Sequence, residues 1–241
     1  MIEIKILLAC EESQTLTIKL REIGHEAFSC DIVECSGGHN EWHIKEDVIP
    51  LLSGDCTFKT LDGIEHSIVG KWDAILAFPP CTHLAVSGAT HFEKKRLDGR
   101  QREGIELFMK IFNADCDKVV VENPIGIISG DYIPKHFPDL AELYKLPIKP
   151  TQIIHPWMFG DGVPKSTCLW IKGLDKLVPQ ITEQPEMEYF EWKDRKTGKL
   201  KRQAKWFYEA LRLSPSERAR VRSKTFDGVA NAMVNQWFSK W

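Results

Sequence analysis

The chain has 241 residues, of which 43% are hydrophobic and 27% charged, and its formal net charge is −2. These values are ordinary for a globular protein and predict one domain with an insertion rather than two equal domains. No run approaches the roughly 18 apolar residues that a membrane-spanning helix needs, so we expect no membrane partner. The N-terminal MIEIKILLAC lacks a small-residue cleavage pattern, and we expect a first strand there rather than a signal peptide.

Cysteine usage points to a reducing compartment. The seven cysteines are scattered, no CxxC pair occurs, and no Cys/His cluster has zinc spacing. His39 and His43 lie near Cys35, but the two glycines between Cys35 and His39 favour a loop. We therefore expect free thiols, no metal site and a cytoplasmic protein.

The first half of the chain alternates short apolar runs with amphipathic segments. Such runs are typical of buried parallel strands, and a 3.6-residue apolar spacing is typical of helices. We expect strands at 4–9, 25–31, 72–78 and 118–121, a strand and turn at 43–52, and helices at 13–23 and 104–114. Alternating strands and helices predict right-handed βαβ units and an open, mostly parallel α/β sheet.

The second half is less regular. Five prolines predict a loop-rich stretch between residues 134 and 156, followed by a strand at 165–174. Residues 188–208 predict a hairpin with its turn at 196–198, and the tail from residue 214 is expected to be helical.

Reactive and polar residues gather where the predicted strands end. In parallel sheets, ligands bind outside the carboxyl ends of the strands. This edge therefore predicts a site lined by carboxylates, an amide and one thiol, and the residues at the strand ends are Cys10, Glu11, Asp31, Asp47, Cys81, Glu122 and Asn123.

Cys81 follows two prolines that end a strand and stiffen the chain. A rigidly placed thiol at a strand end indicates a nucleophile, although a buried cysteine in a strand-terminating turn is the structural alternative. Glu122 ends the next strand, where it can cap a helix or share a pocket with Cys81. A thiolate and a carboxyl that protonates a ring nitrogen are the pair needed for covalent attack on a pyrimidine.

These motifs resemble a known family. FPPCTHLAVSG is similar to the catalytic PPC loop of C5-cytosine DNA methyltransferases, and VVVENPIG to their ENV strand end. The chain is most similar to small phage- and prophage-type relatives, which would place it in the cytoplasm of a bacterial host. The resemblance implies a Rossmann-like class I methyltransferase fold with helices on both faces and a small β-rich insertion. It makes Cys81 the nucleophile and Glu122 with Asn123 the ring contact, while Lys165 and Thr167 stand where the family's basic motif has glutamine and arginine.

The resemblance also implies S-adenosyl-L-methionine as cofactor. Asp31 would bind the ribose and Asp47 would lie near the adenine, while the C-terminal RSKTFDGVANAMVNQW would return to the cofactor pocket. The implied cofactor residues are Ala9, Cys10, Glu11, Ser13, Asp31, Asp47, Pro79 and Asn231. Because ACEESQ replaces a glycine-rich turn, a folate donor such as methylenetetrahydrofolate is the alternative.

DNA is the implied partner, with the target cytosine flipped out of the duplex. We expect residues 82–96 to form a mobile loop over the base, and residues 179–214 to form the inserted DNA-contacting hairpin between the parts 1–178 and 215–241 of the catalytic domain. Aromatic residues between basic ones suit nucleic acid. The expected DNA contacts are Pro80, Thr82, His83, Ser87, Lys94, Lys95, Arg96, Arg195, Lys196, Lys199 and Arg202.

Two other classes remain open. A thymidylate-synthase-like transferase acting on a free pyrimidine nucleotide also uses a PPCH-like stretch and a folate. A DNA-binding relative that has lost cofactor binding would keep the hairpin without enzymatic activity. The sequence leaves the oligomeric state undetermined, with a monomer as one option.

Overall fold

The structure is a computed structural model that describes residues 3–240. Its centre is a seven-stranded sheet in the order β3-β2-β1-β6-β7-β9-β8. The strands are β1 (Lys5–Ala9), β2 (Glu26–Cys30), β3 (His43–Ile44), β6 (Ala74–Ala77), β7 (Val119–Pro124), β8 (Gln152–Ile154) and β9 (Thr167–Lys172).

Two two-stranded hairpins lie outside this sheet, formed by β4 (Cys56–Lys59) with β5 (Glu65–Ile68) and by β10 (Tyr189–Lys193) with β11 (Leu200–Ala204). The helices are α1 (Thr15–Glu22), α2 (Phe92–Leu97), α3 (Arg100–Phe112), α4 (Tyr132–His136), α5 (Pro138–Tyr144), α6 (Lys205–Ala210), α7 (Pro215–Ser223) and α8 (Asp227–Trp237). Within residues 3–240, none of these helices combines the length and apolar character needed to cross a bilayer.

Strand direction confirms the expected fold class. β3, β2, β1, β6 and β7 run parallel, and β9 pairs antiparallel with both β7 and β8. The strand order reverses between β1 and β6, the switch point at which open α/β sheets bind ligands. The mixed α/β sheet with helices on both faces is the predicted Rossmann-like type of fold.

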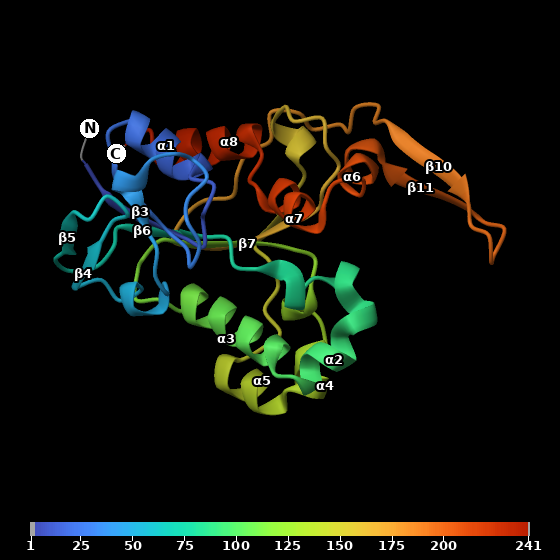
Figure 1. Cartoon of the computed structure of the whole chain (residues 1–241), viewed down its shortest axis with the longest axis horizontal. Coiled ribbons are helices and arrows are strands. Elements are labelled where there is room, and N and C mark those ends of the chain that lie inside the picture. Colours follow the sequence, from blue (N-terminus) through green and yellow to red (C-terminus); the bar gives the residue numbers. More distant parts are fainter. Residues whose placement is uncertain (1–2, 241) are drawn as a thin grey trace.

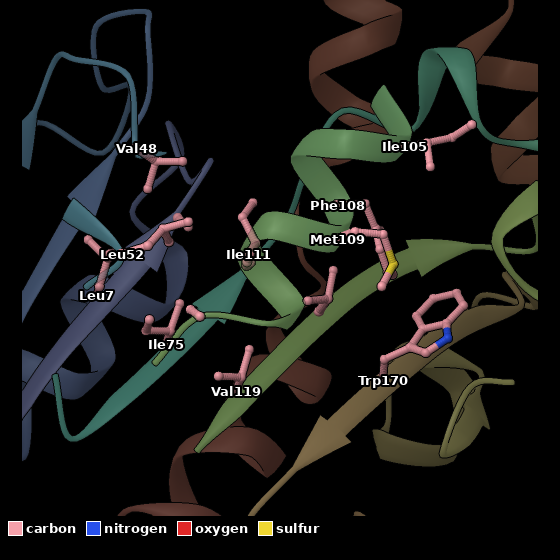
Figure 2. Packing of buried hydrophobic residues seen from close by; sticks show 14 of the residues in the cluster. Leu7, Val48, Leu52, Ile75, Ile105, Phe108, Met109, Ile111, Val119 and Trp170 are labelled. Carbon is pink, nitrogen blue, oxygen red and sulfur yellow. The ribbon is translucent and has the colours of Figure 1, made fainter. Parts of the chain in front are cut away.

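Alternate residues of the buried strands point into two separate apolar layers. On one face, α3 packs Ile105, Phe108 and Met109 over the sheet, where they meet strand residues such as Val119 and Trp170 (Figure 2). On the other face, α1 and α8 cover the sheet (Figure 1). Burial on both faces explains why the strands read as continuous apolar runs in the sequence.

The loop prediction for the proline-rich stretch is wrong in part. Residues 132–144 form α4 and α5 rather than a loop, because Pro138 occupies the first turn of α5, where its missing N–H is unneeded. The sequence analysis also missed α2, β8 and the β4–β5 hairpin.

The hairpin predicted at residues 188–208 is confirmed over β10 and β11 but not beyond them. β10 and β11 pair from Tyr189 opposite Ala204 to Lys193 opposite Leu200, and the ribbon projects away from the body (Figure 1). Residues 205–208, expected in the hairpin, instead begin α6 without an intervening loop. The helical tail is divided into α7 and α8, with the main chain breaking helical geometry at Phe226.

Candidate active site

The Cys81 loop is fixed by main-chain contacts at the carboxyl end of β6. Cys81 starts a short 3-10 turn, and its carbonyl accepts hydrogen bonds from the N–H groups of Leu84 (3.0 Å) and Ala85 (2.9 Å). The buried Asn123 side chain donates to the Pro79 carbonyl at 2.8 Å. Asn123, expected beside the reacting ring, thus anchors the Cys81 loop to β7.

A second tie joins this loop to the chain after β7. Ala85 forms an antiparallel bridge with Gly126, and Ile127 donates its N–H to the Leu84 carbonyl at 3.0 Å. A Cβ atom on Gly126 would lie 2.6 Å from the Leu84 carbonyl oxygen. Only glycine permits this approach, and the approach holds the Cys81 turn beside the end of β7.

Three of the residues expected to be catalytic, Cys81, Glu122 and Lys165, lie close enough for their charges to act on one another. Burial raises the pKa of the Cys81 thiol, and the Glu122 carboxylate raises it further. The Lys165 ammonium and the Arg222 guanidinium act in the opposite direction and lower this pKa. The half-buried thiol therefore lies in an environment where one anion and two cations compete.

Glu122 lies in β7 opposite Leu169 of β9. Burial raises the pKa of its carboxyl, and Lys165 partly offsets this effect. A raised pKa keeps more of the carboxyl protonated toward neutral pH, as a group that gives a proton to a ring nitrogen requires.

Lys165 and Thr167 approach this edge because β9 runs against β7. Thr167 pairs with Pro124, so the beginning of β9 meets the end of β7. The Lys165 ammonium donates to the Arg222 carbonyl at 3.1 Å and lies 5.7 Å from the centre of the Phe226 ring. Thr167 is buried within the sheet.

Arg222 is the site residue that the sequence analysis missed. It belongs to the RSKTF segment, where sequence alone assigns it no contact with a strand end. In the sequence it is one of three arginines at alternate positions (Arg218, Arg220 and Arg222), a pattern that is common on protein surfaces.

The segment after Cys81, expected to be a loop, forms short 3-10 turns followed by α2, and some of its side chains bond to other parts of the protein. Thr82 and Ser87 are exposed, and His83 is half-buried. The Lys95 side chain is buried, and its ammonium donates to the Thr82 carbonyl at 2.5 Å. Lys95, expected to contact DNA, thus supports the Cys81 loop from within.

Lys94, Arg96 and Pro80 complete the expected contacts near Cys81. Lys94 and Pro80 are exposed beside the loop, whereas an Arg96 guanidinium nitrogen lies 3.1 Å from Nδ1 of His136 in α4. Of the three basic residues of α2, Lys94 is therefore the freest for a phosphate.

The turn between β1 and α1 lacks glycine but adopts glycine-like geometry. Cys10 and Gln14 have positive φ angles of 59° and 55°. Each costs on the order of 1 kcal/mol for a residue with a side chain. Gln14 is held by a hydrogen bond from its amide to the His39 carbonyl (2.8 Å), and Gly37 packs so closely that a Cβ there would lie 2.6 Å from the Gln14 Cβ.

Glu11 faces the interior rather than the cofactor edge. Its buried carboxylate accepts hydrogen bonds from the N–H of Leu16 (2.6 Å) and from the N–H (3.3 Å) and hydroxyl (2.7 Å) of Thr17. Burial raises the pKa of Glu11 to about 7 despite these bonds. Glu11 thus closes the start of α1, the helix-capping role that is common for such carboxylates.

Cys10, Asp31 and Asp47 lie together at the switch point. Burial raises the pKa of Cys10 to about 12, and the charges of both aspartates contribute. Asp31 is half-buried and accepts from the N–H of Val33 at 3.3 Å, while the exposed Asp47 accepts from Ile49 at 3.0 Å. The two carboxylates therefore lie close enough to Cys10 for their charges to act on its thiol.

The other implied cofactor residues are more dispersed. Ala9 and Pro79 are buried in and just after their strands, and Asn231 is exposed on α8. Ser13 lines a cavity of about 280 Å³ between the start of α1 and α8, together with Thr15, Ile18, Lys19, Glu22, Ser36, Gly37, Lys224 and Asp227. The C-terminal segment reaches this end of α1 through Lys224 and Asp227, and Asn231 does not line this cavity.

The expected DNA residues of the hairpin are presented to solvent. Arg195, Lys196 and Lys199 are exposed around its tip, and the Arg202 guanidinium lies 4.8 Å from the centre of the Tyr189 ring. A larger hollow of about 550 Å³ at the hairpin base is lined by Glu186, Met187, Glu188, Tyr189 and Lys205. None of the predicted site residues lines it. Among the described residues, no group of three or more His, Cys, Asp or Glu side chains could hold a metal ion.

Comparison with known proteins gives a distant structural likeness. No protein-family model matches the chain, and no curated protein matches it. Among solved structures, the chain is similar to an E. coli protein described provisionally as a DNA modification methyltransferase encoded within a prophage, with a TM-score of 0.42 and 15% sequence identity. The match covers 86% of this chain and 63% of that one, so the chain spans less than two thirds of its length.

Proposed function

We propose that the protein transfers a one-carbon group to C5 of cytosine in DNA through a covalent adduct with Cys81. The observation that carries this proposal is the meeting of a thiol, a carboxyl of raised pKa and two cations at the ends of β6, β7 and β9. The expected donor is S-adenosyl-L-methionine.

In the first step the Cys81 thiol gives its proton to solvent water, and its sulfur forms a bond to C6 of the ring. As the C5–C6 double bond gives up its electron pair, Glu122 transfers its proton to N3 and prevents negative charge from building on the ring. The resulting enamine makes C5 nucleophilic. Lys165 offsets the charge that Glu122 acquires when it loses the proton.

The second step restores the ring and the thiolate. The donor, when bound, supplies an electrophilic one-carbon group to C5. The C5 proton then leaves to a base, its electron pair reforms the C5–C6 double bond, and the C6–S bond breaks. N3 returns its proton to Glu122 and the thiolate takes one from solvent water, so Cys81 and Glu122 regain their starting forms.

The charge at the switch point supports a cationic donor. Asp31 and Asp47 raise the pKa of Cys10 by their negative charge. Such an edge suits hydroxyl and amino donors and a sulfonium, and it repels the carboxylates of a folate. Asp31 and Asp47 would hold the adenosyl part, and the left-handed main chain at Cys10 and Gln14 fits a turn that must approach a ligand.

The projecting ribbon supports DNA as the partner. Residues 189–204 carry six basic side chains against two acidic ones. A two-stranded β-ribbon fits the major groove of B-form DNA, and exposed Phe190 and Trp192 add stacking surfaces. We propose that residues 179–214 form the DNA-contacting insertion.

Nucleoside mass spectrometry tests the proposed reaction. DNA is incubated with the protein and either S-adenosyl-L-methionine or methylenetetrahydrofolate, with C81A, E122Q and C56A in parallel. We expect 5-methylcytosine with the first donor, no product from C81A, a loss of roughly 10²–10⁴-fold with E122Q, and wild-type activity from C56A, whose thiol lies in the separate β4–β5 hairpin.

Other outcomes identify the alternatives. Product formed only with methylenetetrahydrofolate would show that a folate, and not S-adenosyl-L-methionine, is the donor. Product from free dCMP in place of DNA would favour a nucleotide transferase. DNA binding without Cys81-dependent product from either donor would contradict the enzyme proposal and favour a binding protein.

A further inference from the structure

The ribbon formed by β10 and β11 has two faces that differ in their side chains. Successive strand residues point to opposite faces, and residues directly opposite each other in the register share a face. One face therefore carries Phe190 with its partner Gln203 and, further out, Trp192 with its partner Lys201. Aromatic rings, an amide and an ammonium group are thus presented together on this face.

A ring from α6 extends this face into an aromatic row, which we define as Tyr208, Phe190 and Trp192. Since α6 follows β11 directly, its Tyr208 ring stacks on Phe190, with centroids 3.8 Å and planes 9° apart. The Trp192 ring follows at 6.0 Å from Phe190, with the planes tilted by 32°. The Arg212 guanidinium carbon lies 5.3 Å from the centre of the Tyr208 ring. The row therefore runs from α6 outward along the ribbon.

Packing of the protein's own core does not account for the outer part of this row. Phe190 is 39% exposed and Trp192 is 36% exposed, and the ribbon projects away from the α/β body (Figure 1). Exposed aromatic surface bordered by polar groups marks an interaction site. Residues 189–204 carry six basic side chains against two acidic ones, so a fitting partner is anionic and offers flat rings for stacking. Nucleic acid has both properties.

The exposed ring faces distinguish an unpaired strand from a duplex. In a duplex the faces of the bases are stacked on one another, so a protein in either groove meets base edges and phosphates. An aromatic ring can stack on a base only where that base is unstacked, as in a single strand. A row of exposed rings among basic side chains therefore matches successive bases of an unpaired strand.

The inner end of the row is continuous with the candidate active site. Trp206, which also belongs to α6, meets the Phe226 ring edge-on at 5.8 Å. The same Phe226 ring lies 5.7 Å from the Lys165 ammonium at the catalytic edge. The short helix α6 thus joins the row to the surroundings of Lys165, and a strand bound along the row would have its inner end at that edge.

We propose that the aromatic row binds the bases of single-stranded DNA and that the substrate is a cytosine in an unpaired strand. The inference deepens the proposed function and rests on it in taking DNA cytosine as the target. An unpaired cytosine reaches Cys81 without the free-energy cost of leaving a duplex stack. The bases next to it stack on the row, and the basic side chains of the ribbon hold the phosphates.

Fluorescence anisotropy with a labelled DNA strand of mixed sequence, used alone and annealed to its complement, tests the inference without any donor. We expect wild type to bind the single strand at least roughly 10-fold more tightly than the duplex, because only the single strand offers base faces. W192A should weaken single-strand binding by roughly 5- to 100-fold and leave duplex binding unchanged. Since no charge is removed, this loss should be the same at low and at high salt.

Matched variants separate stacking from a general effect on the ribbon. W192F keeps a ring at this position and should retain most of the single-strand affinity. L200A removes an exposed apolar side chain from the opposite face of the same ribbon, where Leu200 pairs with Lys193, and should bind as wild type does. Thermal unfolding checks that each variant is folded.

The inference would be overturned if wild type bound the duplex as tightly as the single strand. Equal losses in W192A and L200A, or equal losses of W192A for both forms of DNA, would also overturn it. The wild-type comparison needs no variant, so it decides the matter even if W192A does not fold.

Nucleoside mass spectrometry on both forms of DNA separates this inference from the proposed function. Modified cytosine in the duplex alone would contradict single-stranded DNA as the substrate and leave the transfer reaction standing. Absence of modified cytosine in both forms would contradict the transfer reaction and leave the binding of the single strand intact.

Discussion

At the scale of single residues, sequence motifs identify Cys81 and Glu122 of the candidate site but not Arg222. Cys81 and Glu122 stand out because each follows an apolar strand in a distinctive tripeptide. Arg222 could not be found in this way, since its approach to Cys81 depends on how α6 and α7 pack. Its neighbour Lys165 lies 57 residues away in the chain.

Glu11 offers a residue-scale prediction on stability. Its pKa is about 7 in the folded protein, above the ordinary value of 4.5, so the folded state binds this proton more tightly than the unfolded state. The contribution of Glu11 to the free energy of unfolding is therefore largest below the unfolded pKa. It is lost as the pH rises through about 7, by roughly 2–3 kcal/mol as an order of magnitude.

Urea unfolding of wild type and E11Q at pH 5 and pH 8 measures this contribution. Between these values wild type should lose stability that E11Q does not lose, because glutamine does not titrate. The same pH dependence in both proteins would show that Glu11 is not the responsible group.

At the scale of elements, the strands were predictable and the short helices were not. The parallel strands are buried on both faces, so their apolar runs mark them without an alternating pattern. The β4–β5 hairpin was missed because CTFK and EHSI bury only Phe58 and Ile68, too few residues for an apolar run. α4 and α5 were missed because prolines were taken as breaks, although Pro138 begins a helix.

The turn that carries Cys81 gives the element-scale prediction. In G126A the new Cβ would meet the Leu84 carbonyl, and the nucleophile turn would have to move away from β7. We expect a loss of roughly 1–3 kcal/mol in unfolding free energy and a larger fall in cytosine modification than stability explains.

Gly130 supplies the matched control for this change. Its φ of −117° is accessible to alanine, and a Cβ there would meet nothing within 4 Å. G130A should therefore retain activity and stability in the same assays. Equal activity in G126A and G130A would show that the close approach of Gly126 to the Leu84 carbonyl is not needed for the reaction.

At the scale of the whole molecule, the ribbon is separable from the α/β body. β10 and β11 form a sheet of their own, and the Lys205 N–H donates to the Glu188 carbonyl at 2.9 Å. The two ends of the ribbon are thus close enough for a short glycine linker to replace residues 189–204.

Excising the ribbon in this way should leave a folded protein that binds DNA weakly. Its thermal unfolding should remain cooperative, whereas its affinity for DNA and the salt dependence of that affinity should both fall, because the basic side chains that release counterions are gone. Fluorescence anisotropy over a salt series measures both quantities. Wild-type affinity with an unchanged salt slope would place the DNA surface elsewhere.

The reversed direction of β9 has a consequence for how this protein folds. Because β9 runs antiparallel to β7, the chain leaves β9 at the end of the sheet opposite Cys81. It must return from there before the Arg222 carbonyl can accept the hydrogen bond from Lys165. Closing such long loops is slow, and contacts between distant segments form late. We expect β1, β2, β6 and α3 to assemble first and the contact between Lys165 and Arg222 to form last, so a nascent or partly folded chain would carry Cys81 without these two cations near it.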